Sequence, residues 1–179
     1  MSDYRVRAKK FLNSVVPYIQ DILDRPWEVA KAIERYNHDF NRHVVIKRGA
    51  VRIVLVTSDY IVKWDYDSSS ASEWGGCISE YNAYLAAKTA GYEYLFAEPT
   101  AIYVNGTMFI IMPRIHNIGW HAHEHVGMYD IFDCIDSDAS DWVYKHIGDL
   151  HHNNWGICKG QVCIIDYASF DDIELYGSC

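Results

Sequence analysis

Apolar residues recur at helical spacing through the first forty positions of the chain. Between residues 4 and 24 they fall three or four positions apart, which predicts a helix that Pro17 breaks or kinks. A second helix is predicted from Pro26 to about Phe40, because proline suits the first turn of a helix. Its predicted inward-facing residues are Trp27, Val29, Ala30, Ile33 and Tyr36.

The spacing then changes to that of extended chain. Short apolar runs separated by polar turns predict three strands, at 44–47, 50–56 and 60–64. A helix over 73–90 follows, with Gly91 placed to cap its C-terminus. Two more strands, 101–104 and 107–112, flank Asn105-Gly106, which is a strong signal for a hairpin turn.

The last third of the chain is more polar. A His-rich connection over 117–126 leads to a helical pattern over 128–147 that is interrupted near Ser137. Two short strands are predicted at 156–158 and 162–165. The order of elements predicts an α+β fold with a five-stranded antiparallel sheet.

Composition narrows the possible classes of protein. With 179 residues, half of them apolar, the chain is long enough to bury one core as a single domain. Its apolar runs are too short to span a bilayer, so we expect a soluble, cytoplasmic protein. Five cysteines without C-x-x-C spacing predict reduced thiols, and a net charge of −8 argues against general nucleic-acid binding.

One group of polar residues points to chemistry. Asp149 is followed by Asn154 and then by Asp166, which ends the apolar run 162–165. A first carboxylate can orient an attacking hydroxyl, while an amide and a second carboxylate supply the oxygen ligands that Mg²⁺ prefers. Asp and Asn also favour ordinary turns, but a carboxylate at the end of a buried strand needs a partner or a metal.

A histidine cluster gives a second, weaker candidate. His121, His123 and His125 alternate, which on extended chain places all three on one side, where they could bind Zn²⁺. Alternating histidines in a polar connection are more often solvated, and no fourth ligand is evident.

The motif residues, taken in order, resemble the protein-kinase-like superfamily over about residues 44 to 168. The sequence Asp-Leu-x-x-x-Asn at 149–154 resembles the kinase catalytic loop, and Asp166 resembles the aspartate of the D-F-G motif. Ile61-Val62-Lys63 resembles the strand that carries the ATP-binding lysine, and Glu80 lies seventeen residues later on the next predicted helix. The resemblance implies an ion pair between Lys63 and Glu80.

The same resemblance implies an architecture and an ATP site. Residues 1–42 would be a helical N-terminal extension, 43–115 an N-lobe and 116–179 a reduced C-lobe with the catalytic loop. ATP and Mg²⁺ would be the cofactors, with Asp149, Lys63 and Glu80 as the catalytic set and Asn154 and Asp166 as metal ligands. The nucleotide would also contact a set of further residues: Gly49, Met112 as gatekeeper, Pro113 and Ile115 as hinge, and His151 near the γ-phosphate.

Within the superfamily, the sequence of these motifs is most similar to that of the Ser/Thr protein kinases of T-seven-like bacteriophages. This similarity implies phosphorylation of host proteins in the host cytoplasm. The chain departs from the kinase pattern at several points. No G-x-G-x-x-G precedes Lys63, Tyr167-Ala168 stands where Phe-Gly is usual, and thirteen residues follow Asp166.

These departures leave two alternatives open. One is a catalytically idle kinase-like protein that inhibits a host or defence factor, and the other is a small-molecule kinase of the aminoglycoside or choline type. A reduced C-lobe would leave apolar surface to be covered, so we also expect a homodimer or an obligate partner.

Overall fold

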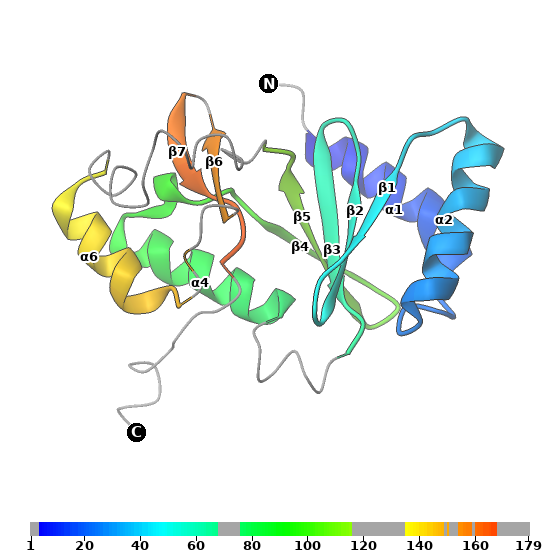
Figure 1. The fold of residues 1–179 in the computed structure, drawn as a ribbon, viewed down its shortest axis with the longest axis horizontal. Helices are drawn as coiled ribbons and strands as arrows, with labels where there is room; N and C mark the ends of the chain where they lie inside the picture. Colours follow the sequence, from blue (N-terminus) through cyan, green and yellow to red (C-terminus); the bar gives the residue numbers. More distant parts are fainter. Residues whose placement is uncertain are drawn as a thin grey trace. The chain divides into compact units, whose positions relative to one another are not determined.

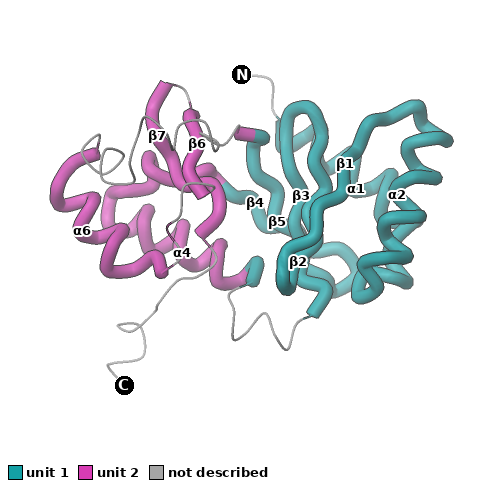
Figure 2. Tube along the Cα trace, viewed as in Figure 1, with its two compact units in different colours: residues 1–77, 99–114 teal, residues 78–98, 115–179 magenta. Residues whose placement is uncertain are grey.

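The computed structural model describes residues 4–67, 76–115, 135–148, 150, 154–158 and 160–167 (Figure 1). The chain divides into two units, each built from two separate stretches (Figure 2). Unit 1 combines Met1–Cys77 with Pro99–Arg114, and unit 2 combines Ile78–Glu98 with Ile115–Cys179. The last of the three boundaries, between Arg114 and Ile115, lies one residue from the predicted end of the N-lobe, whereas residues 78–98 group with unit 2.

Unit 1 contains a five-stranded antiparallel sheet, which confirms this part of the predicted α+β fold. The strand order across the sheet is β1-β2-β3-β5-β4. The strands are β1 (Val45–Arg48), β2 (Arg52–Val56), β3 (Tyr60–Asp65), β4 (Thr100–Val104) and β5 (Thr107–Pro113). Asn105 and Gly106 join β4 to β5 with φ angles of 51° and 82°, the positive values that a tight hairpin turn requires.

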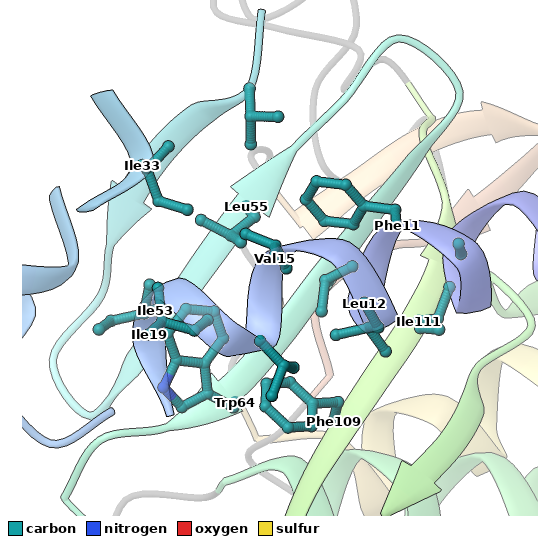
Figure 3. Packing of buried hydrophobic residues seen from close by; sticks show 14 of the residues in the cluster. Phe11, Leu12, Val15, Ile19, Ile33, Ile53, Leu55, Trp64, Phe109 and Ile111 are labelled. Atoms are coloured by element: carbon teal, nitrogen blue, oxygen red, sulfur yellow. The ribbon is translucent and has the colours of Figure 1, made fainter. Parts of the chain in front are cut away.

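Two helices, α1 (Tyr4–Ile19) and α2 (Pro26–Phe40), pack against one face of this sheet (Figure 1). Alternate residues of the strands point at the helices, because side chains alternate between the two faces of a strand. The interlocking side chains of this core, seen in Figure 3, include Leu12, Val15 and Ile19 from α1, Ile33 from α2, and Ile53, Leu55, Trp64, Phe109 and Ile111 from the sheet.

Trp27 corrects one prediction made from the sequence. It was expected to face the core, but it is 76% exposed, whereas Val29, Ile33 and Tyr36 are buried as predicted. Trp27 lies two residues before Val29, which places it about 200° around the helix from that buried position. A side chain in that position points towards solvent.

Unit 2 contains helix α4 (Cys77–Ala90, whose first residue belongs to unit 1), the 3-10 turn η1 (Glu93–Leu95) and helix α6 (Ser137–His146). Gly91 ends α4 with a φ of 83°, as its predicted capping role requires. The interruption predicted near Ser137 is the start of α6, where the Asp136 carboxylate accepts hydrogen bonds from the N–H groups of Asp138 and Ala139. The predicted helical residues 128–134 lie outside the described residues.

A two-stranded hairpin completes the described part of unit 2. Strand β6 (Trp155–Cys158) pairs with β7 (Gln161–Ile164), close to the ranges predicted from the sequence. Residue Ile164 also forms a parallel bridge with Phe96, and its carbonyl accepts a 2.9 Å hydrogen bond from the Ala97 N–H. The end of β7 is thus attached to the segment that follows η1.

Across both units, none of the helices in the described ranges combines the length and the apolar character that a bilayer crossing needs.

Candidate functional site

Lys63 lies on the face of the unit 1 sheet that points away from α1 and α2. Its neighbours in β3, Val62 and Trp64, both point into the helix-covered core, so Lys63 must point to the opposite face. The side chain is only 3% exposed, although lysine is among the residues least often buried without a partner. Its direct partners on the neighbouring strands are Val54 of β2 and Ile110 of β5.

The predicted gatekeeper Met112 shares this sheet face with Lys63. Met112 is directly opposite Ile61 on β3, and Ile61 is two residues before Lys63. Both Met112 and Ile110 are fully buried. One part of the face is therefore apolar, as an adenine-binding surface would need to be.

Two further cations belong to the same face. Lys47 of β1 is paired with Val54, the residue that is also paired with Lys63. Arg52 precedes Val54 by two positions on β2 and so points the same way. The sheet thus brings Lys47, Arg52 and Lys63 to one face, next to its apolar part, an arrangement suited to a ligand with a flat apolar end and a phosphate end.

The turn between β1 and β2, which contains Gly49, is closed by its own hydrogen bonds. The Gly49 N–H donates to the Arg52 carbonyl at 2.8 Å, and the Tyr66 hydroxyl donates to the Ala50 carbonyl. Arg48 in turn donates to the Tyr66 hydroxyl. The Gly49 N–H is therefore engaged within the turn, and a contact between this group and a phosphate stays a prediction.

The predicted hinge follows β5 directly. Pro113 is the last residue of β5 and is paired with Tyr60, and the next N–H, that of Arg114, donates to the Asp59 carbonyl at 2.9 Å. Ile115, the first residue of the second stretch of unit 2, is half-buried. The role of Pro113 and Ile115 in adenine binding stays a prediction.

In unit 2, the hairpin brings Asn154 and Asp166 to the same end. Asn154 directly precedes β6, and its carbonyl accepts a 2.7 Å hydrogen bond from the N–H of Ile165. This bond adds one more residue pair, Asn154 and Ile165, to the hairpin. Asp166 directly follows Ile165. Asn154 is 6% exposed and Asp166 is half-buried.

Tyr167 fixes the chain on the far side of Asp166. Its hydroxyl donates a 2.7 Å hydrogen bond to the Ala97 carbonyl, and its ring meets that of Phe96 edge-on, with centroids 5.0 Å apart. The side chain is 1% exposed. The residues on both sides of Asp166 are therefore held by hydrogen bonds, Ile165 by its bond to Asn154 and Tyr167 by its bond to Ala97.

Glu80 is completely buried on α4. Burial raises the pKa of the Tyr167 hydroxyl well above its ordinary value, and the negative charges of Glu80 and Asp166 contribute to the same shift, as do Tyr84 and Cys163. Glu80 and Asp166 thus both act on the pKa of Tyr167, and Asp166 directly precedes it in the chain.

Asp149, His151 and the three alternating histidines, His121, His123 and His125, lie outside the described residues. Within the described ranges, no group of three or more His, Cys, Asp and Glu side chains is arranged to hold a metal ion. The predicted ion pair between Lys63 and Glu80 would join unit 1 to unit 2, and it also stays a prediction.

A comparison with models of known protein families gives no match, and a comparison with curated protein sequences gives none either. The kinase-like resemblance therefore rests on the motif residues, and the five-stranded antiparallel sheet of unit 1 is compatible with it.

Tyr167 is the residue whose importance the sequence did not reveal. In the comparison with kinases it counted only as a departure from the usual phenylalanine. A tyrosine next to a candidate metal ligand, at the end of an apolar strand, is a usable signal, because a buried tyrosine hydroxyl needs a hydrogen-bond partner.

Proposed function

We propose that this protein is an ATP-dependent phosphotransferase of the kinase-like type, with a Ser or Thr of a protein as the acceptor. The observation that carries the proposal is the hydrogen bond that pairs Asn154 with Ile165, because it brings Asn154 and the next residue, Asp166, to one end of the β6–β7 hairpin. The amide oxygen of Asn154 and a carboxylate oxygen of Asp166 would suit Mg²⁺, which binds hard oxygen ligands and is usually held by few protein groups. When bound with ATP, Mg²⁺ would neutralise charge on the phosphates.

The sheet of unit 1 supports the nucleotide part of the proposal. Lys63 would contact the α- and β-phosphates, with Lys47 and Arg52 adding positive charge on the same face. The buried apolar residues Ile110 and Met112 would contact the adenine. Glu80 would orient Lys63, as the resemblance to kinases implies.

In this scheme Asp149 would accept a hydrogen bond from the acceptor hydroxyl and orient it for attack. A host protein is the acceptor that the similarity to phage kinases suggests.

Calorimetric titration with Mg·ATP tests the division of roles. Asp166→Asn and Asn154→Ala should weaken binding about tenfold or more, because each removes a ligand that acts in the ground state. Asp149→Asn should bind Mg·ATP normally and fail to turn over. Asp141→Asn, an exposed carboxylate on α6, is the matched control and should change neither property. Equal affinity in the Asp166 and Asn154 variants would remove their assigned roles.

Transfer itself is tested with γ-labelled ATP, Mg²⁺ and a bacterial lysate. Labelled protein bands that disappear with Asp149→Asn are the expected result. Labelled small molecules without labelled proteins would instead favour a small-molecule kinase.

One observation favours a second candidate, a kinase-like protein that binds a host factor without catalysis. The β1–β2 turn, with the Gly49 N–H bonded to the Arg52 carbonyl, does not direct that donor at a ligand. An idle protein of this kind would show no labelled product and no measurable Mg·ATP affinity in the wild type.

A further inference from the structure

Within the part of the chain that the structure describes, the outer edge of β1 presents backbone hydrogen-bonding groups that β2 does not use. β1 is the first strand of the described sheet and is paired with β2 on one side. The bond from the Gly49 N–H to the Arg52 carbonyl marks those two residues as a hydrogen-bonded pair. Because such pairs alternate along an antiparallel ladder, Lys47 bonds to β2, whereas the N–H and C=O groups of Ile46 and Arg48 point outwards.

Val44, the residue before β1, shows which hydrogen-bonding groups can pair with this edge. The Asn37 side chain of α2 donates from Nδ2 to the Val44 carbonyl and accepts from the Val44 N–H through Oδ1, both at 2.9 Å. The carboxamide thus supplies the same donor and acceptor as one residue of an added strand. Among the described residues, the outward backbone groups of Ile46 and Arg48 have no equivalent partner.

The side chains around this edge are aromatic and positively charged. The guanidinium of Arg48 lies 5.8 Å from the ring centre of Trp27 and 5.2 Å from that of Tyr66. This stack is on the helix-covered side of the sheet, because Arg48 is paired with the core residue Ile53. Lys47 is exposed on the other side.

The two units of the chain differ in net charge. Unit 1 contains thirteen Lys and Arg against ten Asp and Glu, whereas unit 2 contains three against fourteen, so their net charges are +3 and −11. The β1 edge therefore lies in the positively charged unit of an acidic protein. An acidic ligand is the one whose charge complements it.

We propose that β1 binds an extended, acidic segment of a partner protein as an additional strand. Acidic residues of the segment would lie on the Lys47 face, and the apolar residues between them would cover the exposed indole of Trp27. The outward groups of Ile46 and Arg48 would continue the ladder that Asn37 begins at Val44. This binding does not depend on phosphoryl transfer.

Other occupants fit less well. Pairing with β1 of a second copy would place Lys47 and Arg48 of both copies together, and like charges repel. Single-stranded nucleic acid could stack on Trp27 but lacks the alternating donors and acceptors of a strand. Charged side chains can also simply protect a sheet edge from pairing, but protection gives no reason for an exposed tryptophan at the same place.

The probe is a short fluorescein-labelled peptide in which glutamate alternates with valine, and the measurement is fluorescence anisotropy with the full-length protein. We expect saturable binding of this peptide and none of a peptide with lysine in place of glutamate. The decisive control is the same glutamate peptide N-methylated at every residue, which removes the N–H donors of both strand edges. It keeps its side chains but cannot pair as a strand, so its binding should be lost.

Protein variants locate the site. Lys47→Glu should weaken binding about tenfold, because attraction becomes repulsion, and Trp27→Ala should weaken it severalfold. Lys10→Glu, an equal charge change at an exposed position of α1, should leave binding unchanged. Asp166→Asn should also bind the peptide normally, which separates this proposal from the proposed catalysis.

Hydrogen exchange provides a readout that does not require a variant. On peptide binding the amides of Ile46 and Arg48 should become protected, whereas that of Lys47 should be protected already. The proposal is overturned if the peptide does not bind, if the N-methylated peptide binds equally well, or if labelled single-stranded RNA binds through Trp27 instead.

Discussion

Replacing Tyr167 by phenylalanine tests how the chain next to Asp166 is held in place. The change removes one hydroxyl and keeps the ring that packs edge-on against Phe96. The hydroxyl is 2.7 Å from the Ala97 carbonyl in a side chain that is 1% exposed. Losing a buried hydrogen bond of this kind, with the carbonyl left unsatisfied, costs about 1–3 kcal/mol of unfolding free energy.

We therefore expect Tyr167→Phe to lower the free energy of unfolding by about 1–2 kcal/mol in urea titrations, without a change in the slope of the transition. Tyr167→Ala also removes the packed ring and should cost about 3–5 kcal/mol. Because Tyr167 anchors Asp166, the phenylalanine variant should also bind Mg·ATP more weakly. A fully stable Tyr167→Phe protein would refute the reasoning, since it would mean that this hydroxyl makes no useful bond in the folded state.

The same tyrosine predicts a change of stability with pH. Folding raises the pKa of Tyr167 above that of an ordinary tyrosine, chiefly because the hydroxyl is buried and secondarily because of Glu80. A raised folded-state pKa means that the contribution to stability is present in full below about pH 10 and is lost as the pH rises further. Stability of the wild type should fall in that alkaline range, and the fall should be smaller in Tyr167→Phe.

Further predictions concern the ion pair, the thiols and self-association. If Lys63 and Glu80 form the predicted ion pair, Lys63→Met and Glu80→Gln should couple by about 1 kcal/mol or more in a double-mutant cycle, and effects that add within about 0.5 kcal/mol would contradict it. Burial, together with the neighbouring Cys158, raises the pKa of Cys163 to about 12, so near pH 8 iodoacetamide should label Cys163 far more slowly than a free cysteine. Mass spectrometry that finds Cys163 as reactive as a free cysteine would argue against the burial of Cys163. Sedimentation should show a dimer or a tight complex, and a monodisperse monomer at micromolar concentration would overturn the expected association.

Local sequence patterns predicted the elements and the sheet because each pattern is a property of neighbouring residues. Burial alternates along β2, as one covered face requires, whereas β5 is a continuous apolar run that is buried at four successive positions. The pairing of Asn154 with Ile165 also follows from a local feature. The turn at Gly160, with its φ of 82°, fixes the register of the hairpin and thereby the position of Asp166.

Contacts between distant residues could not be predicted in this way. Tyr167 and Ala97 are 70 positions apart, and no periodic pattern connects a hydroxyl to a particular carbonyl. The bonds between Asn37 and Val44 depend on how a helix end approaches a strand, which composition does not specify. The helical pattern predicts Trp27 on the inward face with the other apolar residues of α2, but its angular position on the helix leaves it exposed.

The division of each unit into two stretches has a consequence for synthesis on the ribosome. Strand β3 pairs with β2 on one side and with β5 on the other. The paired residues Tyr60 and Pro113 are fifty-three positions apart in the sequence, and all of α4 lies between them. The two N-terminal helices and the first three strands emerge as one continuous block and can collapse early around shared apolar residues. Closing the sheet must wait until β5 has left the exit tunnel, and by then α4 has been made. A pause in translation before β5 would therefore leave one side of β3 open to pairing with other nascent chains.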